Sequence, residues 1–455
     1  MIEGEIHVAG PGNRVFEGML KSIRQIPIID CHEHLPVPSM YVTPREPLAF
    51  LLRGYFQFEL VHAGLPRNDL LLLQKDNIPT EKKWPLFKHY WIRTEHTACA
   101  REIKDTMRFY GEKDVTLESI ERLGQKIRNI DEKSFVEFIE SLGIKLLLDN
   151  ILFTAEELKR FIKGDIALPA CYRLLIPLPT FHGTGNGVIW GFGKGPWSFQ
   201  GIQEIASILD KTVTSLDEYL GIVREIMTRL KERGAVGMKD QSAYYRSIDF
   251  HVATREEAER LFNKCLSEPR HGLGWPEAKP LDDFLFHECM RFARDLELSV
   301  QVHTGYPAGT RNRVAGANAA LFAGVLELHQ DVLFDLFHGN WPYMGDLLFL
   351  VKNYPNVYLD LCWAHLADPA YCTDLLERAV FVVSHKKING FGGDYGIPEM
   401  IPAHLSLAQT NIARALSRHV SSGWLSKDEA INMAADWLYN NPNELFSLGL
   451  EPFYA

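Results

Sequence analysis

The sequence of 455 residues lacks the features that mark several protein classes. Its seven cysteines form no Cys-x-x-Cys pair, which argues against a disulfide framework and against a thiolate zinc site. Its apolar runs are much shorter than the roughly 18 residues of a membrane helix. Lys and Arg number 48 against 58 Asp and Glu, and this acidic balance argues against a general nucleic-acid binder.

The N-terminal segment also lacks the positive and apolar regions of a secretory signal. We therefore expect a cytoplasmic protein that contacts neither membrane nor nucleic acid. Its expected partner is a small-molecule substrate, and a homo-oligomer is compatible with this. At 46% hydrophobic and 23% charged residues, the composition is that of a globular chain with a large buried core.

Eight short apolar runs recur along the chain, and each is followed by an amphipathic helical pattern. The runs span residues 26–32, 144–149, 171–177, 235–240, 298–303, 332–338, 357–362 and 388–394. Strands that alternate with helices form parallel sheets, and eight of them close naturally into a barrel. We therefore predict an α/β fold, a distorted (β/α)8 TIM barrel. An open doubly wound sheet is the alternative, but no Gly-x-Gly-x-x-Gly motif follows the first run.

The spacing between the runs is uneven. About a hundred residues separate the first run from the second, and they carry helical patterns at 47–60, 84–110 and 117–142. We expect a barrel made of 1–35 and 143–455, with a helical insertion, 36–142, over its mouth.

Two further segments stand out by composition. The interval 181–195 is rich in glycine and carries His182 and Trp190, which favours a mobile surface loop such as a lid. Two amphipathic segments, 401–420 and 426–439, follow the last run, and we expect them to complete the outer ring and the barrel floor.

The segment 30–34 reads Asp-Cys-His-Glu-His and ends the first run. On a strand, residues two apart project to the same face. His32 and His34 can therefore converge on one metal ion, while Glu33 points away. Taken alone, the motif fits an incidental histidine pair equally well.

Three other runs end in residues of the metal-ligand type. His303 ends the fifth run, His338 ends the sixth and Asp394 ends the eighth. Singly, each has a structural explanation, such as a hydrogen-bonded core histidine or a helix cap. All of these strand ends meet at the C-terminal rim of a barrel, so together they predict a metal centre.

This constellation resembles the amidohydrolase superfamily over nearly the whole chain. The stretches 337–343, 356–360 and 391–394 are similar to its amidohydrolase-2 branch, which includes amidohydrolases and decarboxylases. The insertion around 84–110 and the overall length are more loosely similar to uronate isomerases. The resemblance implies that His32, His34 and Asp394 bind the metal.

The resemblance also implies that His303 is a further ligand and that His338 is a ligand or a polar neighbour of the ion. Binuclear members of the superfamily place a carboxylated lysine on strand four, and Lys239 lies at about that place. An unmodified ammonium repels a dication, so Lys239 is a ligand only if it is carbamylated. Otherwise it is expected to recognise an anionic substrate.

Several side chains that follow the predicted strands or lie in the insertion are suited to binding substrate. Arg93, Arg246 and Arg311 carry the planar fork that binds a carboxylate, although solvated surface arginines explain each one equally well. Trp341 and Trp363 follow the sixth and seventh runs, where they are expected to wall a pocket.

We therefore expect a metal-dependent hydrolase that acts on an amide, lactone or ester of a small carboxylate-bearing substrate. Imidazoles and a carboxylate favour Zn²⁺, with Mn²⁺ or Fe²⁺ as alternatives. Asp394 is the expected proton shuttle, and His338 and His303 are the other catalytic candidates. A uronate-isomerase-like isomerase and a metal-dependent decarboxylase remain alternatives. A non-catalytic barrel is disfavoured because the metal-ligand set is intact.

Overall fold

The computed structural model describes residues 14–40, 46–127, 131–183, 199–268 and 272–454. Eight strands in these ranges form one parallel sheet in the order β1 to β8. They are β1 (Ile28–Glu33), β2 (Ile144–Asp149), β3 (Tyr172–Pro177), β4 (Ala235–Asp240), β5 (Ser299–Val302), β6 (Phe334–Leu336), β7 (Val357–Asp360) and β8 (Ile388–Asn389). The predicted (β/α)8 barrel is thereby confirmed.

The sheet curls into a nearly closed barrel because the segment after β8 returns to β1. Cys31 N–H donates to the Phe391 carbonyl (3.1 Å), and Asp394 N–H donates to the His32 carbonyl (2.9 Å). His34 N–H donates to the Tyr395 carbonyl in the same way (2.9 Å). This seam places the end of β1 directly beside Asp394.

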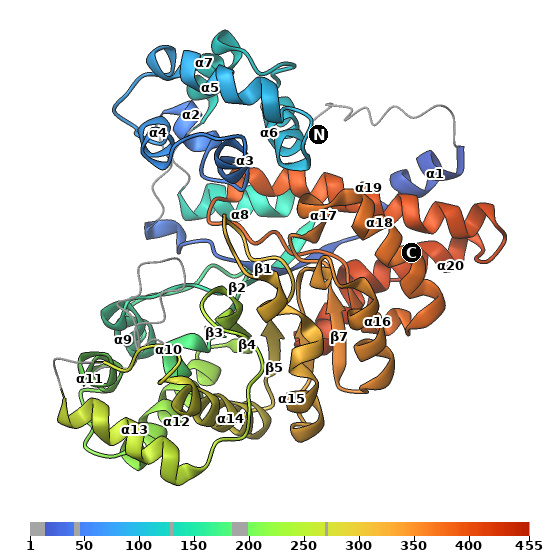
Figure 1. Cartoon of the computed structure of the whole chain (residues 1–455). Helices are drawn as coiled ribbons and strands as arrows, with labels where there is room; N and C mark the ends of the chain where they lie inside the picture. The colour runs from blue at the N-terminus through green and yellow to red at the C-terminus, as the bar shows by residue number, and fades with distance from the viewer. Residues whose placement is uncertain (1–13, 41–45, 128–130, 184–198, 269–271, 455) are drawn as a thin grey trace.

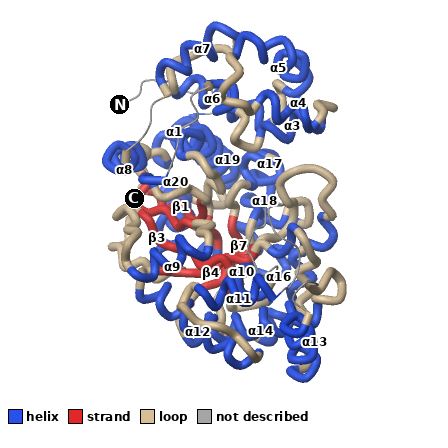
Figure 2. The backbone as a smooth tube through the Cα atoms, turned by 90° about the vertical axis from the view of Figure 1, so that its left-hand side faces the viewer, coloured by secondary structure: helices blue, strands red, loops and turns tan. Residues whose placement is uncertain are grey.

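Helices surround the strands, as Figures 1 and 2 show. Around the barrel lie α1 (Arg14–Ile23), α8 (Glu132–Ser141), α9 (Ala155–Lys163), α10 (Pro179–His182), α11 (Phe199–Ser207), α12 (Leu216–Glu232), α13 (Arg255–Ser267), α14 (Lys279–Asp295), α15 (Ala323–Leu328), α16 (Met344–Asn353), α17 (Ala364–Ala367), α18 (Pro369–Val382), α19 (Ile401–Ser421), α20 (Lys427–Ala435) and α21 (Asn441–Leu445). The strands are almost wholly buried, as expected for a parallel sheet covered by helices.

The floor of the barrel is filled from the C-terminal end of the chain. Leu445 and Phe446 pack with Ile29, Leu148 and Leu175, which come from the first three strands. This apolar plug closes the end of the barrel opposite to the predicted metal centre.

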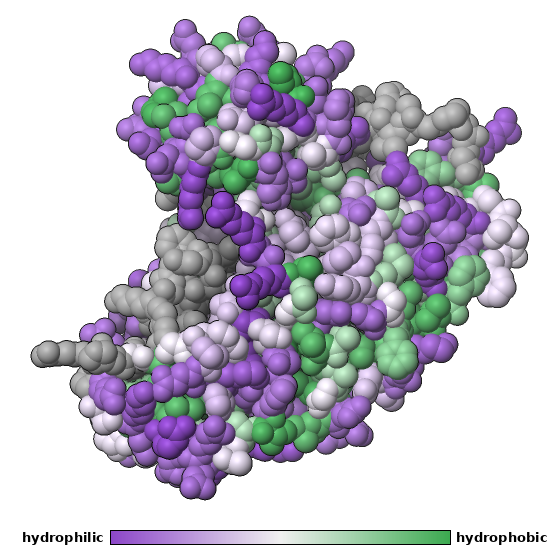
Figure 3. All heavy atoms as spheres, in the orientation of Figure 1, coloured by the Kyte–Doolittle hydropathy of each residue, from purple (hydrophilic) through white to green (hydrophobic). Residues whose placement is uncertain are grey.

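The insertion forms its own group of helices above the barrel (Figure 1). They are α2 (Pro47–Leu51), α3 (Phe56–His62), α4 (Arg67–Leu73), α5 (Thr80–Thr94), α6 (Ala98–Phe109) and α7 (Leu117–Lys126). Phe56, Phe87 and Trp91 pack ring against ring in its core. Hydrophilic side chains predominate on the face of the insertion seen in Figure 3. Helix α8, in contrast, packs against β2.

Two other expectations can be compared with the structure. All seven cysteines are buried, and none of them forms a disulfide. No helix in the described ranges is both long enough and apolar enough to cross a membrane. Residues 184–198, with Trp190 and most of the predicted lid, lie outside the described ranges.

Candidate metal centre

Three side chains converge at the seam between β1 and the segment after β8. His32 Nε2 lies 3.3 Å from His34 Nε2. Asp394 Oδ1 lies 3.5 Å from His32 Nε2 and 3.3 Å from His34 Nε2. We call these three residues the triad. Ligands at about 2.0–2.1 Å from a tetrahedral zinc ion are separated by about 3.3 Å, so the triad has the spacing of a metal site.

The other ring nitrogens of the triad are anchored outward. His34 Nδ1 donates to the Asn150 carbonyl (3.0 Å), and His32 Nδ1 bonds to Gln301 Oε1 (2.9 Å). Gln301 Nε2 donates to the Cys31 carbonyl (2.8 Å), which fixes Oε1 toward His32. With both Nδ1 atoms as donors, each Nε2 keeps a lone pair that faces the centre of the triad.

The backbone that carries Asp394 has an unusual conformation. Asp394 has a φ of 62°, in the left-handed region that non-glycine residues rarely adopt. A Cβ on the preceding Gly393 would collide with the Glu33 carboxylate. His338 and Trp363, which follow β6 and β7, also have positive φ values of 62° and 57°. Such strain is concentrated at functional sites, where surrounding contacts hold it in place.

The electrostatics of the triad suit metal binding. Burial lowers the pKa of His32 well below its usual value, and the positive charge of Lys239 lowers it further. Burial opposes ionisation of Asp394, but in acid, where the neighbouring imidazoles carry the additional proton, the hydrogen bond from His34 and the charges of His32 and His338 hold its pKa well below the usual range. The triad therefore combines a neutral imidazole with a carboxylate at neutral pH.

His303 and His338 form a second group, which we call the imidazole pair. His338 Nε2 lies 2.9 Å from His303 Nδ1. His338 Nδ1 donates to the Cys362 carbonyl (2.7 Å), and His303 Nε2 lies 3.3 Å from the Tyr306 carbonyl. Burial lowers the pKa of His338 to about 4 and that of His303 well below its usual value. Both rings are therefore neutral at pH 7.

Two neutral imidazoles have two N–H groups for these three contacts. His338 Nδ1 must carry a hydrogen, because it donates to the Cys362 carbonyl. His338 Nε2 is then an acceptor, so His303 Nδ1 carries the second hydrogen and donates to it. The lone pair of the imidazole pair therefore lies on His303 Nε2, beside the Tyr306 carbonyl. The pair is close to the triad, because His338, Cys362 and Asp394 have ligand-type atoms within 4.8 Å of one another.

Residues 215–447 match a family model described as Amidohydrolase, and this range is more than half of the chain. The chain belongs to the amidohydrolase family. The matched range contains Asp394 and the imidazole pair, whereas His32 and His34 precede it. The resemblance predicted from the strand ends is thereby confirmed.

Individual proteins resemble this chain in sequence or in fold. Protein fluG of Emericella nidulans is 26% identical over 237 residues, which cover 49% of this chain and 27% of that protein. The amidohydrolase thus spans about a quarter of that relative's length. The uronate isomerase of Thermotoga maritima superimposes with a TM-score of 0.74 at 14% identity, over 96% of this chain and 98% of its own.

The glucuronate isomerase of Caulobacter crescentus gives the same TM-score of 0.74 at 17% identity, over 100% of this chain and 98% of its own. A candidate metal-dependent hydrolase from Lactobacillus casei gives 0.63 at 15% identity, over 94% of this chain and 97% of its own. At such low identity these likenesses concern the fold.

A cavity of about 520 Å³ opens beside the centre of this amidohydrolase, and we call it the mouth cavity. Its walls include Tyr55 from the insertion, Tyr306, Arg311, Trp341 and Trp363. The Trp363 ring lies 5.4 Å from the His338 ring, centroid to centroid, so the cavity borders the imidazole pair.

Lys239 lies inside the barrel on β4. Its Nζ lies 3.3 Å from the centre of the Phe337 ring, and it has no hydrogen-bond partner among the described residues. Burial lowers the pKa of Lys239 to about 8, against the attraction of Asp394 and Cys362.

The three arginines singled out in the sequence have different places. Arg246 is buried, donates to Asp283 and stacks on the Phe250 ring at 4.2 Å. Arg93 is exposed on α5, with its guanidinium 5.5 Å from the Tyr90 ring. Of the three, Arg311 lines the mouth cavity.

Sequence reasoning missed several residues of the centre. Gln301 precedes His303 by two positions, so the same-face rule for strands was a usable signal for it. Asn150 directly follows β2 and was equally accessible as a strand-end polar residue. Tyr55 donates from the insertion to the Asp394 carbonyl, and nothing local in the sequence connects these two residues.

Proposed function

We propose that this amidohydrolase is a metal-dependent hydrolase of an amide, lactone or ester in a small substrate that carries a carboxylate. The triad carries this proposal, because its three ligand atoms are 3.3–3.5 Å apart and their outer contacts leave lone pairs facing inward. Two imidazoles and a carboxylate favour Zn²⁺, and Mn²⁺ or Fe²⁺ also accept such ligands.

A divalent ion held by the triad supplies a Lewis acid that lowers the pKa of water toward about 7. The residues of the chain supply the proton transfers. Asp394 stays a carboxylate at neutral pH, so Oδ2, the oxygen outside the triad contacts, accepts a proton and returns it to the leaving group.

The imidazole pair provides a second proton acceptor. His303 Nε2 carries the free lone pair, and protonation there adds an N–H that donates to the Tyr306 carbonyl. All three contacts of the pair are then satisfied, so one extra proton fits the geometry. We assign His303 Nε2 as the basic atom of the pair and His338 as the group that orients His303.

The mouth cavity supports a small anionic substrate. Arg311 offers a guanidinium to a carboxylate, and Trp341 and Trp363 offer flat apolar walls. Lys239, buried against the Phe337 ring and attracted by the charge of Asp394, adds positive potential at the inner end. Arg246 is assigned a structural role in this proposal, because Asp283 occupies its guanidinium.

A second candidate is a sugar-acid isomerase. The likeness to two uronate isomerases extends over the barrel and the insertion together, which favours isomerisation as the second candidate reaction. The same triad would then bind hydroxyl and carbonyl oxygens of the sugar acid, and His303 Nε2 would move a proton between neighbouring carbons.

Metal analysis together with product masses tests the proposal. Purified enzyme is assayed for bound metal and incubated with a panel of carboxylated amides, lactones, esters and hexuronates. A product that gains the mass of one water supports the hydrolase. An unchanged mass with a new carbonyl position replaces it with the isomerase, and loss of CO2 replaces both with a decarboxylase.

A further inference from the structure

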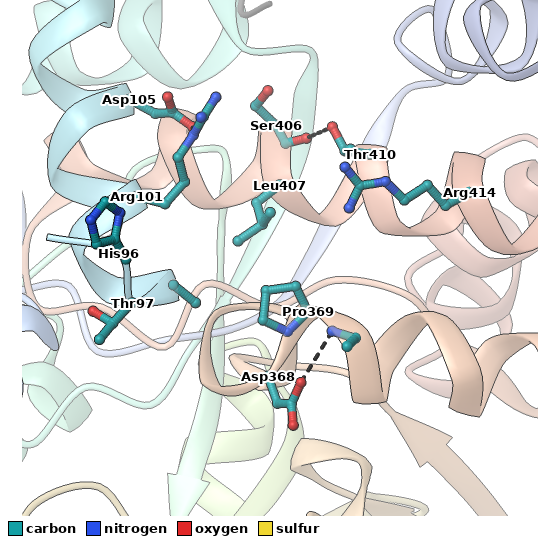
Figure 4. Close-up of a pocket in the computed structure, with 12 residues that line it drawn as sticks. His96, Thr97, Arg101, Asp105, Asp368, Pro369, Ser406, Leu407, Thr410 and Arg414 are labelled. Atoms are coloured by element: carbon teal, nitrogen blue, oxygen red, sulfur yellow. Dashed lines mark hydrogen bonds and ion pairs between the residues drawn. The ribbon is translucent and has the colours of Figure 1, made fainter. Parts of the chain in front are cut away.

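A second cavity lies between the insertion and the barrel (Figure 4). It has a volume of about 440 Å³, which is within the range of small-ligand pockets. Its walls come from α6 in the insertion and from the start of α18 and the middle of α19 in the barrel. We call it the side cavity. Its lining residues differ from those of the mouth cavity.

Two arginines line the side cavity from different elements. Arg101 comes from α6, and Arg414 comes from α19, with Leu407 between their side chains in Figure 4. Arg101 Nε donates to Asp105 (2.8 Å), but its Nη2 is buried and has no hydrogen-bond partner among the described residues. Arg414 is half-buried. In the described part of the chain its guanidinium has no ion-pair partner.

The acidic groups at the side cavity are already engaged. Asp105 accepts from Arg108 as well as from Arg101, so one carboxylate serves two guanidinium groups. Asp368 caps α18 by accepting from Ala370 N–H (3.1 Å) and also accepts from Trp341 Nε1 (3.2 Å). Neither carboxylate neutralises Arg414.

Arg418, four positions after Arg414 on α19, adds a second positive charge nearby. Arg418 is paired with Glu377 (2.6 Å) and lies near Asp374 (3.6 Å). Burial lowers the pKa of Arg414, and the charges of Arg418 and Arg101 lower it further. Arg414 is therefore a half-buried cation that has no acid of its own among the described residues, an arrangement that a bound anion would stabilise.

The remaining walls suit a ligand with an apolar body. Leu407, Pro369 and Ala370 line the cavity and provide aliphatic surface. Helices α6 and α18 both begin at the cavity. Thr97 and Asp368 cap them, so the helices contribute the field of their positive ends in addition to the arginines.

We propose that the side cavity binds a small organic anion whose carboxylate or phosphate is clamped between Arg101 and Arg414 and whose apolar part rests on Leu407 and Pro369. Such a ligand joins the insertion to the barrel, because one arginine comes from each. It is distinct from the substrate of the mouth cavity.

The test uses phenyl phosphate and benzoate as probes, titrated calorimetrically into the metal-loaded enzyme at constant ionic strength. We expect at least one of them to bind, and Arg414→Gln to weaken that binding by about tenfold or more, as expected for a lost charge-assisted contact. Arg378→Gln is the matched control, because it removes an exposed arginine from the neighbouring α18. Preference for phenyl phosphate or for benzoate identifies the ligand as a phosphate ester or a carboxylate.

Arg311→Gln separates the two cavities. Binding at the side cavity is expected to survive this change in the mouth cavity. Binding that is lost in Arg311→Gln and kept in Arg414→Gln would overturn the proposal, and so would the absence of binding by both probes.

A measurement on the unaltered protein covers the case in which Arg414→Gln does not fold. Phenylglyoxal modifies accessible arginines, and peptide mass spectrometry reports each site. The bound probe is expected to protect Arg101 and Arg414 at least several-fold while Arg378 reacts as before. Equal modification of all three with and without the probe would contradict the site.

Discussion

The triad and the imidazole pair are built from the same kind of side chain at the same rim, yet they are arranged for different tasks. In the triad, Gln301 and Asn150 hold the Nδ1 atoms of His32 and His34 outward, and both Nε2 atoms face Asp394. In the pair, His338 Nε2 is bound to His303 Nδ1. The partner of the second ring nitrogen therefore determines whether a histidine offers a metal a lone pair.

This difference also separates two kinds of chemistry. The triad leaves three atoms about as far apart as the ligands of a single ion. The pair leaves one lone pair, on His303 Nε2, and a chain of contacts that has room for one more proton. Metal binding and proton uptake are thus predicted to be separable by mutation.

The largest expected effect is loss of the metal from the triad. His32→Ala removes one of three ligand atoms, so we expect both metal content and turnover to fall to background. His338→Ala is the matched control, because it removes an imidazole from the same rim and should keep the metal. Elemental analysis of both variants checks this. Equal metal loss from both would mean that the pair belongs to the coordination sphere.

The next effect separates binding from chemistry within the triad. Asp394→Asn keeps an oxygen at the same place but cannot take up a proton. We expect part of the metal to remain while turnover falls about 10² to 10⁴-fold, the usual contribution of a general base. Rates normalised to bound metal measure this. Near wild-type turnover at full occupancy would move the proton shuttle to His303.

A smaller effect tests the outward anchor. Gln301→Met removes the acceptor that holds His32 Nδ1 and preserves the length of the side chain. We expect metal affinity to weaken about 10 to 100-fold, as is typical for partners that orient ligands. Competition with a chelator measures the affinity. Gln409→Met, a buried change on α19, is the control, and the anchor has no role if the two variants behave alike.

The fold was largely predictable because its signals are local. Each of the eight apolar runs carries its own periodicity, and the predicted bounds at 144–149 and 235–240 coincide with β2 and β4. The ligand types were visible for the same reason, since His303, His338 and Asp394 each end a run. The type of side chain at the end of a strand is visible in the sequence even when the neighbouring segments are unknown.

The separation of the rim histidines into the triad and the imidazole pair was not predictable, because it depends on contacts between distant segments. The sequence placed His303 with the triad, whereas in the structure it contacts His338, which is 35 positions away. The role of Arg246 depends on Asp283 in α14, and that of Tyr55 depends on a carbonyl 339 positions later. No local pattern specifies such pairings.

A still smaller effect is expected in the pH dependence of a variant at His338. In the proposed mechanism His338 acts as a neutral ring, and it becomes protonated as the pH falls through its pKa of about 4. At pH 5.5 it is therefore almost wholly neutral, whereas an ordinary imidazole with a pKa near 6.5 would be only about one tenth neutral. We expect the ratio of wild-type to His338→Gln activity to change less than about twofold between pH 7.5 and 5.5.

That ratio is informative because other buried groups titrate in the same range. Burial raises the pKa of Asp30 and of Asp360 to about 7, and both are present in the wild type and in the variant. Their titration cancels in the ratio. A tenfold decrease of the ratio at pH 5.5 would show that His338 is solvated and that the pair does not hold it neutral.

The last prediction concerns Lys239, for which we expect no effect on the metal. Its Nζ contacts the Phe337 ring and is not one of the three converging atoms. With its pKa of about 8, the unmodified side chain is mainly an ammonium at pH 7 and repels a dication, so Lys239→Met should keep the metal of the triad at the wild-type amount, one ion per chain. Intact mass spectrometry of the wild type should show no carbon dioxide adduct. If Lys239→Met instead halves the metal content, then Lys239 is carbamylated and bridges a second ion. The triad would then be one half of a binuclear centre. Metal binding would no longer be confined to the triad, and the assignment of proton uptake to the imidazole pair would have to be revised.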